Sequence, residues 1–254
     1  MSFMKKMMAR VGVGSSAVDT ILNRNVLVPG ETVDGVIKIR AGSVEQTVEK
    51  IDLSLHTTYV QKKDDSTVTK STEIARYEVA HQFTLQPNEE KEFPFSFPLP
   101  LDAPISKGRS QVWLQTGLDI KGAIDPQDKD LIEVAPHPYV SAFFDAVDGL
   151  GFKLREVENE EAHGFGRLPF IQEFEFRVAH GAFRSRLDEL EAVFQPVSKD
   201  QLRVILEIDR KARGFSGFLS EMLETDESKV QFIITTDDVN EIQRQLTDVL
   251  NRYA

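Results

Sequence analysis

The chain of 254 residues has a net charge of −11 and contains no cysteine. Its basic residues do not gather on one stretch, which argues against a nucleic acid partner, and the missing thiols exclude disulfides and thiolate metal ligands. No apolar run approaches the roughly 18–20 residues that a membrane span needs, and the N-terminus lacks the continuous apolar region of a secretory signal. We therefore expect a protein of the reducing cytoplasm.

Residues 1–11 could form a short amphipathic helix. One face of this helix would carry Phe3, Met4, Met7 and Met8. Such a face could bind a partner protein, contact an anionic membrane surface or pack on its own domain. Two helical turns are too short for firm membrane binding, which favours packing on the domain. The four side chains remain a candidate partner-binding patch.

Residues 29–40 predict a half-buried β-strand. A Pro-Gly turn leads into this segment. Val33, Gly35, Ile37 and Ile39 then fall on one face at a period of two residues, while polar side chains fall mainly on the other. No catalytic group lies within the segment, so its function is expected to depend on its surface.

The same alternation recurs along the first half of the chain. In residues 51–59, Asp52, Ser54 and His56 alternate with apolar residues. The prolines of residues 93–100 place that segment at a sheet edge or a bulge, because proline cannot donate to a ladder. About seven such segments, separated by turn residues, predict an antiparallel β-sandwich.

A stiff linker, Ala135-Pro136-His137-Pro138, divides the chain into residues 1–135 and 136–254. Apolar residues at helical spacing follow it, between Pro138 and Gly149, and predict a short helix. The linker therefore separates two expected domains.

The second half predicts another, shorter β-sandwich. Its expected strands, about five in number, are residues 152–157, 170–178, 187–194, 202–208 and 230–234. Phe215, Phe218 and Leu219 have helical spacing and predict a helical insert, which is a second candidate partner-binding patch. Apolar residues at spacings of three and four from Val239 to Tyr253 predict an amphipathic C-terminal helix, which Thr236 can cap.

Several motifs together resemble the bacterial sporulation-control family named for stage zero, member M. The resemblance implies an arrestin-like architecture of two tandem β-sandwiches and a cytoplasmic regulatory role in a bacterium. The matching segments are Val18-Asp19-Thr20-Ile21-Leu22, Pro29-Gly30-Glu31, Leu53-Ser54-Leu55, Thr57-Thr58-Tyr59-Val60, Pro94-Phe95-Ser96-Phe97, Thr116-Gly117-Leu118-Asp119-Ile120-Lys121, Asp125-Pro126, Gly151-Phe152-Lys153-Leu154-Arg155, Gln172-Glu173-Phe174-Glu175-Phe176 and Arg186-Leu187-Asp188-Glu189-Leu190-Glu191.

Motifs for catalysis, cofactors and metals are weak. Residues 12–17 fit a loose dinucleotide fingerprint, but a Met-rich segment precedes them where a strand is required. The five histidines are scattered without metal-ligand spacing. Asp125, Asp128 and Asp130 could offer oxygen atoms to a hard cation or form a solvated acidic loop, and they lack the EF-hand spacing. We expect no catalytic residues, no cofactor and no metal.

A polar network between the two domains is the sharper hypothesis. Arrestin-like proteins can couple their sandwiches through buried charges, so oppositely charged groups of the two domains could meet at the interface. The alternative, that all six are ordinary exposed charges, stays open. The candidates are Asp119, Lys121 and Asp130 in the first domain and Arg155, Arg177 and Arg186 in the second.

The sequence therefore predicts a non-enzymatic adaptor or regulator that binds other proteins. A chain with 17 phenylalanines has aromatic side chains to spare for a binding surface. The first alternative is a small-molecule or lipid binder that uses the groove between the domains. The second is an enzyme whose site is assembled from dispersed residues.

Overall fold

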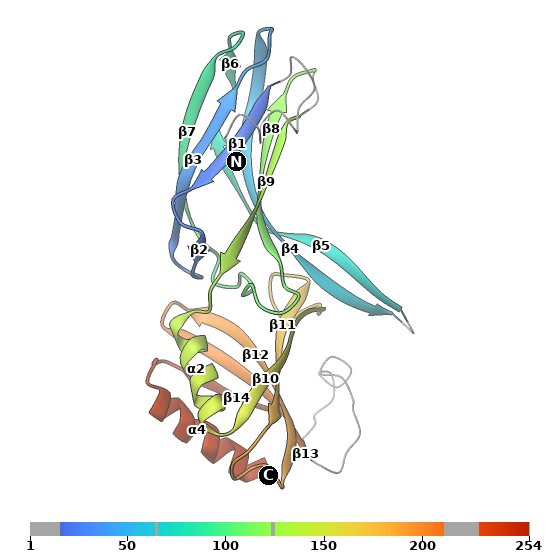
Figure 1. Ribbon diagram of the computed structural model, residues 1–254, viewed down its shortest axis with the longest axis vertical. Helices are drawn as coiled ribbons and strands as arrows, with labels where there is room; N and C mark the ends of the chain where they lie inside the picture. Colours follow the sequence, from blue (N-terminus) through green and yellow to red (C-terminus); the bar gives the residue numbers. More distant parts are fainter. Residues whose placement is uncertain (1–15, 64–65, 123–124, 211–228, 254) are drawn as a thin grey trace. The chain divides into compact units, whose positions relative to one another are not determined.

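The structure is a computed structural model that describes residues 16–63, 66–122, 125–210 and 229–253 (Figure 1). The chain forms two compact units, and it passes from the first unit to the second after Val134. Two further segments, Thr58–Lys70 and Pro104–Ser110, pack with the second unit. The expected β fold, with a linker helix and an amphipathic C-terminal helix, is confirmed.

The first unit contains two β-sheets. The smaller sheet is antiparallel in the order β1-β3-β7. In the larger sheet β4 pairs with β8, β8 with β9, and β9 with β2, while β5 and β6 also pair with β4. The bounds are β1 Ala17–Leu22, β2 Val26–Leu27, β3 Thr32–Arg40, β4 Gln46–Lys63, β5 Ser66–Ala80, β6 Phe83–Leu85, β7 Glu90–Pro98, β8 Val112–Ile120 and β9 Gln127–Val134.

The apolar faces of these strands form the core of the first unit. Ile51, Leu53 and Leu55 of β4 are fully buried. Gly35 of β3 allows a close approach, because a Cβ atom there would lie 2.3 Å from the carbonyl oxygen of Ile21. The alternate residues of β4 are polar and lie on the side of the sheet away from this core.

The second unit has one antiparallel sheet in the order β14-β13-β12-β11-β10, and helices α2 and α4 pack on one of its faces (Figure 1). Among the described residues, helices make this layer where the sequence predicts a second sandwich. The Phe143 and Phe144 rings of α2 contact Phe174 and Phe176 of β11, and the apolar stripe of α4 belongs to the same core. The bounds are α2 Pro138–Gly149, β10 Phe152–Glu161, β11 Phe170–Val178, β12 Leu187–Ser198, β13 Gln201–Arg210, β14 Lys229–Ile234 and α4 Val239–Tyr253.

Both helices begin at a polar side chain. His137 Nδ1 accepts a hydrogen bond from the backbone N–H of Tyr139, at 3.3 Å, at the start of α2. Asp238 Oδ1 accepts from the N–H groups of Asn240 and Glu241, at 2.8 and 3.3 Å, at the start of α4. Asp238 is therefore the capping residue of α4. Thr236 Oγ1 accepts from the N–H of Asp238, which precedes the first turn of the helix. No helix in the described part of the chain is long and apolar enough to cross a membrane.

Candidate functional site

A polar groove lies on the outer side of the larger sheet of the first unit. Its volume is about 270 Å³, and its lining comes from β4, β5, β8, β9 and the turn between β8 and β9. We call it the Gly117 groove, after the glycine in its lining. The lining residues are Lys50, Asp52, Ser54, His56, Arg76, Gln115, Gly117, Leu118, Asp119, Asp125 and Gln127.

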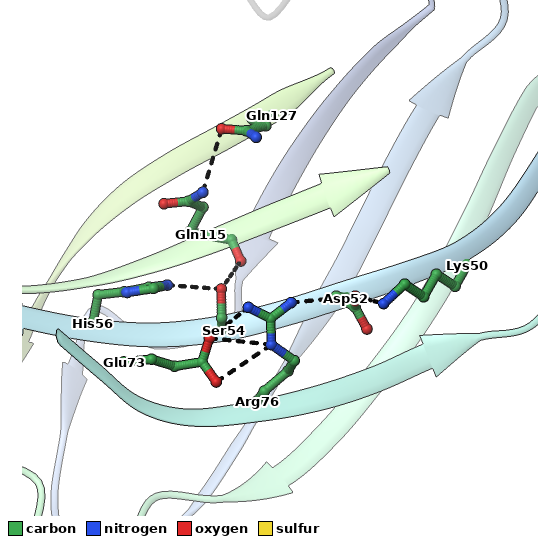
Figure 2. A network of polar contacts seen from close by, with 8 residues as sticks. All are labelled: Lys50, Asp52, Ser54, His56, Glu73, Arg76, Gln115 and Gln127. Carbon is green, nitrogen blue, oxygen red and sulfur yellow. Dashed lines mark hydrogen bonds and ion pairs between the residues drawn. The ribbon is translucent and has the colours of Figure 1, made fainter. Parts of the chain in front are cut away.

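Asp52 is the centre of an ion-pair network in this groove (Figure 2). Its Oδ2 atom lies 2.7 Å from Lys50 Nζ and 3.3 Å from Arg76 Nη1. Arg76 also pairs with Glu73, whose two carboxylate oxygens lie 3.3 and 3.1 Å from Arg76 Nε. The hydrogen bond to Asp52 raises the pKa of Lys50, and the hydrogen bond to Glu73 raises that of Arg76. Both cations are therefore held in their charged form.

Ser54, His56 and Gln115 form the neutral part of the lining (Figure 2). Ser54 Oγ donates to the carbonyl oxygen of Gln115 at 3.3 Å and lies 2.9 Å from His56 Nε2. The His56 ring stacks on Trp113 at 5.5 Å, and Lys129 Nζ lies 3.8 Å from the centre of the Trp113 ring. Burial lowers the pKa of His56, so the imidazole is neutral at pH 7.

Gly117 leaves the wall of the groove open. A Cβ atom built on this residue would meet no heavy atom within 4 Å. Asp119 is two residues further along the same face of β8, and Asp125 lines the same end of the groove. Asp125 Oδ1 accepts from the N–H of Ile120 at 2.9 Å. Asp119 lies opposite Lys50 in the pairing of β4 with β8, and its charge contributes to the raised pKa of Lys50. The arrangement can therefore bind a polar or charged group from outside.

No group of three or more potential metal ligands occurs in the described ranges of the chain. Of the acidic residues weighed as cation ligands, Asp125 and Asp128 bind backbone instead. Asp128 Oδ2 accepts from the N–H of Thr20 at 2.8 Å, and Asp128 is almost fully buried. This contact ties β9 to β1, which gives Asp128 a structural role within the first unit.

Three candidates of the expected polar network belong to the first unit. Asp119 lines the Gly117 groove. Lys121 is exposed, and its backbone N–H donates to the carbonyl oxygen of Thr47 at 3.0 Å. Asp130 is half-buried and lies opposite Leu114 in the pairing of β9 with β8.

The candidate arginines of the second unit have partners within that unit. Arg155 pairs with Glu175 and lies 3.7 Å from Glu189, while Arg177 Nε lies 3.6 Å from the second oxygen of Glu189. The guanidinium of Arg186 lies 5.0 Å from the centre of the Phe183 ring. Coupling between the domains stays a prediction.

Both predicted partner-binding patches lie outside the described residues. The first comprises Phe3, Met4, Met7 and Met8, and the second Phe215, Phe218 and Leu219. The Gly117 groove itself was not predicted as a site. Its sequence signal was the row of polar residues on β4, at positions 52, 54 and 56, which alternates with the buried face. Such a row is common on exposed strands, so the pattern alone could not distinguish a groove from a plain solvated surface.

The chain is similar to proteins of sporulation control. A family model with the description "SpoOM protein" matches residues 4–212. The sporulation-control protein spo0M of Bacillus subtilis (strain 168) is 43% identical over 258 residues, with the whole of both chains covered. The crystal structure of Spo0M from Bacillus subtilis matches with a TM-score of 0.88 and 42% identity, covering 95% of this chain and 100% of that one.

Proposed function

The chain belongs to the SpoOM family of sporulation-control proteins, and we propose that it is a cytoplasmic regulator that acts by binding another protein, without catalysis. The Gly117 groove is the observation on which this proposal rests. It offers charged and neutral hydrogen-bonding groups on a rigid sheet, which suits recognition of a partner's side chain.

The size and lining of the groove favour a protein partner over a small molecule or a lipid. Its volume of about 270 Å³ lies below the 300–1,000 Å³ typical of small-molecule pockets. Leu118 is the one aliphatic side chain in a lining that is otherwise polar or charged, apart from Gly117. An acyl chain would therefore gain little from burial there, while a polar side chain of a partner could fill the space.

The Ser54 and His56 pair does not support an enzyme. A hydroxyl within hydrogen-bond reach of an imidazole resembles a nucleophile with its base. However, Ser54 is only 5% exposed, and its hydroxyl donates to the carbonyl of Gln115. A nucleophile has to reach its substrate, so this hydroxyl is better explained as a link between β4 and β8.

The test is photocrosslinking of the full chain in cells of the source bacterium. A photoreactive phenylalanine at Gln127, an exposed position at the groove, should form adducts with a partner protein. Gly117→Phe should abolish these adducts, because the new ring fills the groove while its Cβ atom meets no neighbour. Gly166→Phe is the matched control, since that glycine also has open space above it but belongs to the second unit. Adducts that persist unchanged in Gly117→Phe would contradict the proposal.

A further inference from the structure

We propose that the Gly117 groove binds an arginine side chain of the partner, with the guanidinium group against the carboxylates of Asp119 and Asp125. The inference rests on the proposed function and specifies the partner's chemistry.

The charges of the groove leave its Asp119 end negative. Lys50 and Arg76 both lie against Asp52, and Arg76 is also held by Glu73. Lys50 also lies opposite Asp119 in the pairing of β4 with β8, and the charge of Asp119 adds to the raised pKa of Lys50. The two cations therefore face four carboxylates, those of Asp52, Glu73, Asp119 and Asp125, so a net negative charge remains at the groove. The neutral state of His56 adds no opposing positive charge.

The form of the groove suits a guanidinium group. A planar guanidinium forms two parallel hydrogen bonds with carboxylates and sheds its hydration more readily than an ammonium group does. Gly117 has no side chain that would keep the arginine away, so the flat guanidinium group can approach the strand closely. Asp125 uses one oxygen for the N–H of Ile120, which fixes its carboxylate in place.

The charge of the whole chain favours the same guest. A net charge of −11 attracts positively charged partners and raises their association rate at low ionic strength. An arginine on a basic segment of the partner would be attracted by the net charge of the chain and would then bind the carboxylates of the groove. We therefore expect binding to weaken as salt is added.

The test uses isotope-labelled full-length chain and two end-blocked tripeptides, Gly-Arg-Gly and the same peptide with citrulline in place of arginine. Citrulline keeps the shape of arginine but has no charge. The arginine peptide should cause saturable NMR shifts of the Gly117 and Asp119 amides, and the citrulline peptide should not. Asp119→Asn should weaken arginine binding roughly tenfold, as expected for a charge-assisted hydrogen bond.

Asp188→Asn is the matched control, because it removes an equal charge from an exposed position of the second unit. It should leave binding unchanged. Equal shifts with citrulline, unchanged affinity in Asp119→Asn or no saturable shift would each overturn the arginine assignment. If the assignment fails while Gly117→Phe still abolishes crosslinking, the proposed function stands. If the peptide binds but crosslinking is unaffected, the proposed function fails instead.

Discussion

Asp52 lies between two cations on the outer side of the larger sheet. Its side chain is 12% exposed, whereas those of Lys50 and Arg76 are 42% and 51% exposed. The cations can regain water when the carboxylate is removed. The loss in free energy of unfolding should therefore be smaller than for a fully buried ion pair. The network should position side chains in the groove more than it stabilises the unit.

We predict that Asp52→Ala lowers the free energy of unfolding of the first unit by about 1 kcal/mol. Combined with Arg76→Ala in a double-mutant cycle, it should give a coupling energy of roughly 0.5–1 kcal/mol. Denaturant unfolding followed by the fluorescence of Trp113, the only tryptophan, reports on this unit.

The exposed pair of Lys38 and Glu92, 2.7 Å apart on β3 and β7, provides a matched cycle in the same unit. We expect a smaller coupling energy for this pair than for Asp52 and Arg76, because solvent screens it more. If both cycles give the same coupling energy, the partial burial of Asp52 does not strengthen its ion pair, and the prediction is wrong.

The strands themselves could be predicted from the sequence, because burial of one face imposes a period of two residues. The groove could not, since it depends on which strands become neighbours. Asp52 and Arg76 are 24 positions apart in the chain and meet because β5 pairs with β4. Alternation does not give this register. The charge of Asp119 marked it as a candidate in the sequence, and its place in the lining of the groove is visible only in the structure.

At the scale of one element, the capping residue of α4 could not be predicted from the sequence alone. Thr236 and Asp238 are both good capping residues, and sequence preference alone does not decide between them. The structure decides by geometry, since the Asp238 carboxylate accepts from two N–H groups of the first turn. Its negative charge also interacts favourably with the positive end of the helix dipole.

We predict that Asp238→Ala destabilises α4 by about 1 kcal/mol and Thr236→Ala by clearly less. Hydrogen exchange of the Asn240 and Glu241 amides measures the effect where it arises. These amides should exchange faster in Asp238→Ala, while Asp238→Asn should retain most of the protection because an amide oxygen can still accept. Faster exchange in Thr236→Ala than in Asp238→Ala would show that Thr236 is the capping residue.

At the scale of the whole molecule, the acidic chain gathers part of its negative charge on one face of the second unit. Glu173 of β11 and Glu191 of β12 lie on the same side of their sheet as Glu207 of β13. Burial, together with the nearby charge of Glu160, raises the pKa of Glu173 to about 7. Burial and the charges of Glu173 and Glu207 raise that of Glu191 to about 9.

The sign of the effect on stability follows from proton binding. An unfolded glutamate loses its proton near pH 4.5, whereas folded Glu191 keeps it to about pH 9. Between these values the folded chain binds more protons than the unfolded chain, so the free energy of unfolding falls as the pH rises. The destabilisation is absent below pH 4.5, grows through the neutral range and is complete above pH 9.

We therefore predict that Glu191→Gln unfolds at a higher temperature than the unchanged chain at pH 8, with little difference at pH 5. The amide stays neutral at both values, so the decline in stability with pH should become shallower. Thermal unfolding of the full chain across this range, followed by the circular dichroism of α2 and α4, measures it. Asp188→Asn, an exposed substitution on the same strand, should leave the slope unchanged. A slope that Glu191→Gln does not alter would show that Glu191 is already charged at neutral pH in the folded protein.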